Sequence, residues 1–271
     1  MNNLLRFRIA FQTIKDYQKI TIILTILFMV LAAMYCGMFP AFQGVLEDMA
    51  GSGAFEPFSS FFGPAAMDMA TYVGFINLEL YQIFWIVILG ILIGFIAASI
   101  ISKEIEGKTI DLLMSNPVSR KQIVFEKFLG LIPFTLVINF ATMLSVMGIT
   151  VAIGESLDFG NLFLTHLASI PYFLAILSIG LLISVIIDEK MKASIFFIAV
   201  LMGMYVLDTV SKTVPDYESI GYASIIHYFD TYDVLKFGKV DMAGILVLII
   251  VITVCLVLSM IYFEHKDINC A

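Results

Sequence analysis

Residues that could do chemistry are few inside the apolar runs of this sequence, and their spacing limits what that chemistry could be. Asn139, Thr142 and Ser145 recur at i, i+3 and i+6 within one run, so a helix would carry them on one side. Such a row can form hydrogen bonds to a neighbouring helix, or it can line the path of a substrate. Both interpretations stay open, and the second makes the three residues a candidate translocation path.

Catalysis inside a membrane would need more than these polar residues. An intramembrane enzyme should show a convergent set, such as a histidine with a carboxylate, and His166 has no evident partner in the sequence. An ion-driven carrier usually has a carboxylate near the centre of a span, whereas Glu79 and Asp208 fall at the ends of apolar runs. We therefore predict no catalytic residue, and we interpret His166 as interfacial and the two carboxylates as hydrated. An ion-driven secondary transporter or an intramembrane enzyme is the alternative.

Sulfur-containing side chains raise the question of a metal. The sequence has 15 methionines, and thioether sulfur suits Cu(I). Groups such as Met29, Met34 and Met38 are also spaced for a helix face in a soft membrane core. The cysteines show neither paired nor metal-type spacing, and two of them fall inside apolar runs: Cys36, Cys255 and Cys270. We predict buried free thiols, no metal site and no cofactor, with copper transport as the alternative.

The composition indicates that the bilayer is the main solvent of this chain. Hydrophobic residues make up 61% of the 271 residues, charged residues make up 14%, and the mean hydropathy is +1.00. The formal net charge of −7 argues against a nucleic-acid partner, which needs a basic face. Residues 1–19 are charged throughout and the first apolar run is long, so we expect no cleavable signal peptide. One domain is expected over residues 1–271.

The apolar runs predict an all-α integral membrane protein with six transmembrane helices. Each run is close to the roughly 20 residues that cross a bilayer core. The runs cover residues 20–39, 80–101, 128–153, 162–187, 193–210 and 242–263. Gly90 and Gly94 form a GxxxG pattern that permits close helix contact in the second run. Pro171 predicts a kink or a break in the fourth.

Two further segments are expected to lie at the membrane surfaces. Residues 1–19 alternate apolar and basic side chains at helical spacing, which indicates an N-terminal amphipathic interfacial helix on anionic lipid. An ordinary basic flank to the first span is the alternative. Residues 219–238, SIGYASIIHYFDTYDVLKFG, are too apolar for a free loop and too short and mixed for a span. They predict re-entrant or interfacial outer helices before the sixth span, with a simple sealing lid as the alternative.

The distribution of lysine and arginine predicts the orientation of these spans. With the N-terminus in the cytoplasm, the inner segments 1–19, 102–127, 188–192 and 264–271 hold 4, 5, 2 and 1 of these residues, which is 12 of the 15. The outer segments 40–79 and 154–161 hold none, and segment 211–241 holds the remaining three. We therefore predict a multi-pass protein of the cell membrane with cytoplasmic N- and C-termini.

The charged run 102–127, SKEIEGKTIDLLMSNPVSRKQIVFEK, has more internal pattern than a tether needs. Ile105, Thr109, Leu112 and Leu113 fall at i, i+4, i+7 and i+8, which places them on one face of a helix. Asn116 and Pro117 then end that helix, because the residue before a proline is pushed out of the α region.

A second helix is predicted to begin directly after Pro117. Ser119 and Gln122 have the spacing of a capping box. Arg120 and Lys121 then occupy a helix N-terminus, where the helix dipole disfavours cations by about 0.3–1 kcal/mol. Partner carboxylates or anionic lipid could offset this, and simple retention of positive charge on the inner side is the alternative. Two short helices hinged at a proline on a membrane surface predict a docking element.

The run EIEGKTIDLLMSNPVSRKQIVFEKFLG resembles the permease subunits of type-2 ABC transporters, the exporter-like class. The residues that match the family pattern after the second span are Glu104, Glu106, Gly107, Thr109, Leu112, Leu113, Pro117, Val118, Ser119, Arg120 and Lys127. Lys108 departs from the pattern, because many relatives have the glycine and the threonine adjacent. The segment HYFDTYDVLKFG and the ending YFEHKDI are weaker echoes, and the resemblance covers essentially the whole chain.

The resemblance implies that ATP is hydrolysed elsewhere. In this family the loop between spans two and three is a coupling helix that rests in a groove of a separate cytosolic ATP-binding subunit. The chain itself has no GxxxxGK[ST] phosphate loop. The residues expected to couple to that subunit are Glu104, Glu106, Thr109, Leu112, Leu113, Pro117, Val118, Ser119 and Arg120. Leu112, Leu113 and Val118 would form an apolar knob within a charged rim. The other expected partners are a second permease, as homodimer or heterodimer, and membrane lipid.

Overall fold

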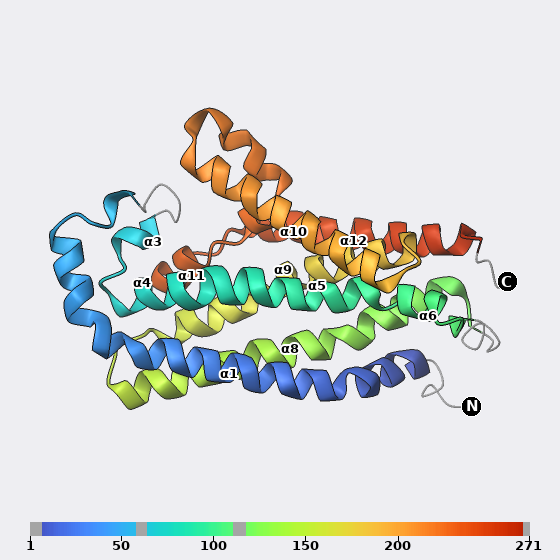
Figure 1. The fold of residues 1–271 in the computed structure, drawn as a ribbon, viewed down its shortest axis with the longest axis horizontal. Helices are drawn as coiled ribbons and strands as arrows, with labels where there is room; N and C mark the ends of the chain where they lie inside the picture. The colour runs from blue at the N-terminus through green and yellow to red at the C-terminus, as the bar shows by residue number, and fades with distance from the viewer. Residues whose placement is uncertain (1–6, 58–63, 111–117, 268–271) are drawn as a thin grey trace.

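Six long helices lie alongside one another in an elongated bundle (Figure 1). The computed structural model describes residues 7–57, 64–110 and 118–267, and within these ranges it is helical with no strand. Six helical segments of this part of the chain are long and apolar enough to cross a membrane. Their bounds are Arg8–Gly51 (α1), Tyr72–Glu106, Arg120–Ile153 (α8), Phe159–Ile186 (α9), Lys190–Thr213 (α10) and Met242–His265 (α12). The predicted number of spans agrees with the structure.

The predicted interfacial helix at residues 1–19 is not a separate element. The first long helix, α1, begins at Arg8 and continues without interruption through the expected boundary at Ile20. No glycine or proline lies between these residues, so nothing in the sequence favours a break there. The helix also continues through Pro40 to Gly51, beyond the expected end at residue 39. The first span and its basic flank therefore form one continuous helix.

The second span is assembled from consecutive helical segments of different pitch. It begins with α4 (Tyr72–Ile76), continues as a π-helix, η2 (Asn77–Leu89), and then as α5 (Gly90–Ser99). The predicted role of the GxxxG pattern is confirmed. A Cβ atom on Gly94 would lie 1.9 Å from the Phe197 ring of α10, and one on Gly90 would lie 2.8 Å from Ile176 of α9. The two glycines allow α5 to pack directly on both helices.

The second span and α9 form the centre of the bundle, because they are the most buried of the six long segments. The third span, α8, begins at Arg120 and not at the expected residue 128, because Ser119 caps it there. A break at Pro171 does not occur, since α9 is helical from Phe159 to Ile186. Glycines again allow close packing: a Cβ on Gly130 of α8 would lie 2.6 Å from Thr13 of α1.

Short helices close one end of the bundle, as predicted for the segment before the last span. They are α3 (Pro64–Met67), the 3₁₀ helices η3 (Pro215–Ala223) and η4 (Ile225–Tyr228), and α11 (Thr231–Phe237). Lys236 of α11 binds Asp68, which follows α3, with 2.7 Å between Nζ and Oδ2. This ion pair ties the two outer segments together. Their re-entrant or interfacial position in a bilayer stays a prediction.

The opposite end of the bundle contains the described parts of the four segments that were predicted to be cytoplasmic from their lysine and arginine residues. In Figure 1 the described chain begins and ends at this end, where α6 (Ser102–Glu106) also lies. Hydrogen bonds join these segments directly. The Oε2 of Glu126 accepts from the backbone N–H of Ile9 at 2.8 Å, and the Oε2 of Glu106 accepts from the N–H of Lys190 at 2.9 Å. We refer to this part of the molecule as the charged end.

Candidate coupling site

The coupling element starts on a buried serine pair. The Oγ of Ser184 on α9 accepts hydrogen bonds from the backbone N–H of Ile101 (2.8 Å) and Ser102 (3.1 Å). The Oγ of Ser102 lies 3.0 Å from the oxygen of Ala98 and 3.1 Å from that of Ser184. Because Ser102 and Ser184 are fully buried, these bonds fix the start of the element on α9. The signal of this contact in the sequence is Ser184, a polar residue inside an apolar run.

The first predicted helix of the element is shorter than its pattern suggests. α6 ends at Glu106, and Gly107 and Lys108 form a turn in which Lys108 has φ +53°. The helix does not continue from Ile105 to Thr109, so the expectation of one continuous apolar face is wrong at this point. Thr109 instead folds back, and its Oγ1 hydrogen-bonds to the carboxylate of Glu104.

The apolar knob falls largely outside the described residues. Leu112, Leu113 and Pro117 belong to residues 111–117, which lie outside the described residues, so their roles stay predictions. Val118 is half-buried and packs against the core. The capping of the second helix is confirmed, because the Oγ of Ser119 accepts from the N–H of Gln122 at 3.1 Å. That helix is not short, however, since it is the first turn of α8.

The predicted charged rim is engaged within the chain itself. Glu104 forms an ion pair with Lys127 of α8 at 2.9 Å. Glu106 caps the N-terminus of α10 through the N–H of Lys190. Because these carboxylates satisfy groups of other helices, they fasten the element to the bundle. Glu104 is half-buried, whereas Glu106 is exposed.

Arg120 finds its counter-charge inside the molecule. Its Nη1 donates to the backbone oxygens of Phe263 (3.3 Å) and Lys266 at the C-terminal end of α12. Lys121 forms an ion pair with Glu264 at 2.7 Å. The cations at the start of α8 are therefore offset by the negative end of another helix and by a carboxylate. Neither a partner protein nor anionic lipid is needed to explain them.

Comparison with known protein families identifies the family of this chain. The family model of ABC-2 family transporter proteins matches residues 14–268. The chain belongs to this family. It is the membrane subunit of an ATP-driven transporter that works with a partner ATPase, and it is not itself catalytic. No curated protein matches the chain significantly.

The polar row on α8 of this permease makes hydrogen bonds between helices. Asn139 is fully buried, and its Nδ2 donates to the oxygen of His166 (2.9 Å) and to the Oγ of Ser169 (3.1 Å) on α9. Thr142 is also buried and donates to the oxygen of Ile138. Ser145 faces the other way. Its hydroxyl donates to the oxygen of Met29 on α1 at 2.7 Å. A translocation path along these residues stays a prediction.

His166 has two partners that the sequence did not reveal, and it lies inside the bundle. Its Nδ1 contacts the side-chain oxygen of Asn139, and its Nε2 lies 3.0 Å from the hydroxyl of Tyr81. An amide oxygen only accepts, so Nδ1 carries the proton, and in the neutral ring Nε2 accepts from the Tyr81 hydroxyl. The Trp85 ring packs edge-on at 4.7 Å. The interpretation of His166 as interfacial is wrong, since the side chain is fully buried.

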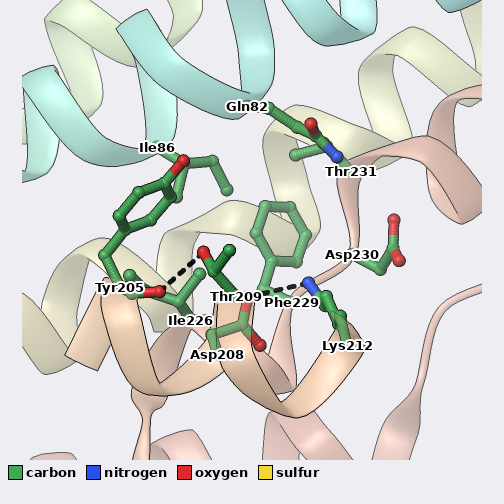
Figure 2. A pocket seen from close by; sticks show the side chains of 10 residues that line it. All are labelled: Gln82, Ile86, Tyr205, Asp208, Thr209, Lys212, Ile226, Phe229, Asp230 and Thr231. Atoms are coloured by element: carbon green, nitrogen blue, oxygen red, sulfur yellow. Dashed lines mark hydrogen bonds and ion pairs between the residues drawn. The ribbon is translucent and has the colours of Figure 1, made fainter. Parts of the chain in front are cut away.

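A second polar cluster lies at the end opposite α6. A cavity of about 50 Å³ separates α10 from η2 and from the chain between η4 and α11 (Figure 2). Its walls are Gln82, Ile86, Tyr205, Asp208, Thr209, Lys212, Ile226, Phe229, Asp230 and Thr231. Asp208 is more enclosed than the sequence indicated, since only 5% of its side chain is exposed, and its hydration would come from this cavity. Its carboxylate is neutralised by Lys212 at 2.8 Å and faces the imidazole of His227 at 3.4 Å.

This pairing explains how a carboxylate can be buried at the end of a span. The signal was present in the sequence as the i, i+4 spacing of Asp208 and Lys212. The cavity has room for a few water molecules. Among the described residues, no group of three or more histidine, cysteine, aspartate or glutamate side chains could hold a metal ion. Of the cysteines in this part of the chain, Cys36 is buried and Cys255 half-buried, and both are free thiols.

Proposed function

We propose that this permease exports an amphiphilic or otherwise unspecified substrate, and that its charged end is the cytoplasmic surface on which the ATP-binding subunits dock. The observation that carries the proposal is the fastening of α6 (Ser102–Glu106) to the bundle. The element begins on the Ser102–Ser184 pair, is held to α8 by Glu104 and Lys127, and joins α10 through Glu106. A push on this element would reach three transmembrane helices at once.

The orientation follows from the charge distribution. The described parts of the segments that hold 12 of the 15 lysine and arginine residues lie at the charged end. Basic residues are retained on the cytoplasmic side of membrane proteins. We therefore propose that both termini lie in the cytoplasm and that the protein resides in the cell membrane. ATP-binding subunits are cytosolic, so this side is the one they can reach.

The mechanism uses closure of two ATPase subunits as the moving part. Two such subunits require two permease chains, so we propose a dimer of this chain or a pair with a related permease. When the subunits close on ATP, they would displace the element, and α5 and α8 would tilt with it because both helices continue directly from its ends. The helices are closely packed at Gly90, Gly94 and Gly130, so they cannot move closer together. They would therefore move as rigid bodies.

Substitution of the predicted apolar knob tests the proposal. Leu112→Asp with Leu113→Asp places two charges in the predicted contact with the ATP-binding subunit. We expect the permease to fold, to lose co-purification with its ATP-binding subunit, and to lose its effect on ATP hydrolysis. Met191→Asp is the matched control, since Met191 is an exposed apolar residue at the same end but outside the element. Unchanged assembly and turnover in the double variant would refute the proposed docking site.

A further inference from the structure

Lys266 directly follows α12 and is the basic residue of the YFEHKDI ending. Its Nζ donates hydrogen bonds to the backbone oxygens of Val185 (2.6 Å) and Ile186 (3.1 Å), the last residues of α9. It also forms an ion pair with Asp188. The final carbonyl groups of a helix lack intrahelical donors and carry partial negative charge, so the ammonium group caps α9.

The environment of this lysine is unusual for a residue at a membrane surface. Only 9% of its side chain is exposed, whereas 59% of the Asp188 side chain is exposed. A lysine that gives up its hydration needs several partners in return, and here two carbonyl groups and a carboxylate provide them. The amine is therefore held in one place, and it is not a mobile surface charge.

The backbone of Lys266 is hydrogen-bonded to the first residue of α8, at the end of the coupling element. The guanidinium of Arg120 donates to the carbonyl oxygens of Phe263 and Lys266, and it lies 5.9 Å from the centre of the Phe263 ring. Arg120 is the first residue of α8, directly after the element. Lys266 thus accepts a hydrogen bond from the start of α8 through its carbonyl and donates to the end of α9 through its side chain. The two contacts meet in one residue.

A separate contact holds the other side of the junction between α9 and α10. Glu106 of α6 accepts from the N–H of Lys190, the first residue of α10. The junction therefore has two attachments, one through α6 and one through Lys266. Loss of Lys266 would leave the α6 attachment intact, so the end of the bundle should still assemble without it.

From these contacts we infer that Lys266 is a positioning residue that transmits movement of the coupling element to the α9–α10 junction. The inference rests on the proposed function, because it needs the element to move when ATP binds. Movement of the first turn of α8 would displace the end of α12 through Arg120, and Lys266 would carry that displacement to Ile186. The YFEHKDI ending thereby acquires a role in coupling that is distinct from anchoring the last span.

Hydrogen exchange at the junction tests the inference without knowledge of the substrate. The full permease and its ATP-binding subunit are reconstituted in lipid nanodiscs, and exchange of the backbone amides of residues 183–192 is compared with and without ATP and vanadate. We expect an ATP-dependent change in the wild type that is lost in Lys266→Met. Lys266→Arg should restore it, since a guanidinium can donate to the same carbonyl groups. A merely structural role would alter exchange equally in both nucleotide states.

The control is Lys192→Met, which removes an exposed lysine (70% of its side chain) from the same end of the molecule. It should keep the wild-type change. An ATP-dependent change that persists in Lys266→Met overturns the inference, and so does a wild-type complex that binds ATPase but shows no change. Failure of the wild type to bind the ATPase refutes the proposed function instead. If Lys266→Met does not fold, Lys266→Gln, which removes the charge and is one bond shorter, should give the same loss.

Discussion

Glu104 and Lys127 form an ion pair across the coupling element, with 2.9 Å between Oε1 and Nζ. Only 17% of the Glu104 side chain and 4% of the Lys127 side chain are exposed. One partner lies on α6, at the start of the element, and the other lies in the second turn of α8. The pair therefore fixes where the two ends of the element stand relative to each other, whatever residues 111–117 do between them.

Breaking this pair should destabilise the permease. Glu104→Gln leaves the buried ammonium of Lys127 without a counter-charge, and we expect a loss of about 3 kcal/mol in the free energy of unfolding. The double variant with Lys127→Met should recover part of it, because no unpaired charge remains. Thermal unfolding in detergent micelles, followed by fluorescence of the single tryptophan, Trp85, measures both variants.

An exposed ion pair at the same end provides the control. Glu189 and Lys192 have side chains that are 57% and 70% exposed, so Glu189→Gln should cost at most about 1 kcal/mol. Equal losses in Glu104→Gln and Glu189→Gln would contradict the importance given to burial of the Glu104 pair.

The sequence predicted those features that depend on neighbours along the chain. Six apolar runs gave six long helices, because composition over about 20 residues determines what can cross a bilayer. The cap at Ser119 and the close contact at Gly94 were predicted correctly for the same reason. Even the last segment before the sixth span, α11, was expected as a short helix.

Features that depend on distant partners could not be predicted. Glu126 caps α1 from another span, and its partner Ile9 is 117 residues away. Asp208 and His166 were both assigned to wetter surroundings, because their partners come from other turns and other helices. The role of Arg120 was misjudged in the same way. Pairing across the bundle is a property of the packed helices, and no periodicity along the chain encodes it.

Lys108 is the one non-glycine residue with positive φ in the described part of the chain, at +53°. The left-handed region is unfavourable for residues with a Cβ by about 1–2 kcal/mol. Lys108→Gly should therefore raise the free energy of unfolding by up to about 1 kcal/mol, after the entropy that glycine adds to the unfolded chain. Lys192→Gly, at a helical position of α10, should lower it by a similar amount. A lower melting temperature for Lys108→Gly than for the wild type would show that the positive φ of Lys108 does not strain the backbone.

A methyl group at Gly94 should force α5 away from α10. Its Cβ would lie 1.9 Å from the ring of Phe197, which is itself fully buried. We expect Gly94→Ala to cost about 1–3 kcal/mol, as overpacked cores do. Gly148→Ala on α8 is the matched control, since no atom lies within 4 Å of the added carbon. That variant should be neutral or more stable by up to about 1 kcal/mol. Equal melting temperatures for the two variants would refute the close contact.

The ion pair between Lys236 and Asp68 predicts a dependence on pH at the end of the bundle opposite α6. Burial acts to lower the pKa of Lys236, but hydrogen bonds to Asp68 and Tyr232 and the charge of Asp68 outweigh it, so the pKa lies above its ordinary 10.5. The resulting stabilisation is complete below the ordinary pKa and is lost as pH rises through the raised one. The difference in melting temperature between wild type and Lys236→Met should therefore be constant from pH 7 to 9 and shrink above pH 10.5. A difference that grows with pH would contradict the assignment.

The hydrogen bonds of Asn139 separate a structural role from a place on the translocation path. Asn139→Leu leaves the Nδ1–H of His166 and the hydroxyl of Ser169 without their partner, and we expect a loss of about 1–3 kcal/mol. Ser145→Ala breaks one bond, to the backbone of α1 at an exposed site, and should cost about 0.6 kcal/mol or less. Melting temperature and ATP hydrolysis of the assembled complex are measured for both. A structural role lowers stability in Asn139→Leu and leaves hydrolysis per folded complex unchanged, because the bonds hold α8 to α9 without contacting substrate. Unchanged stability with altered substrate-stimulated hydrolysis would place Asn139 on the path instead.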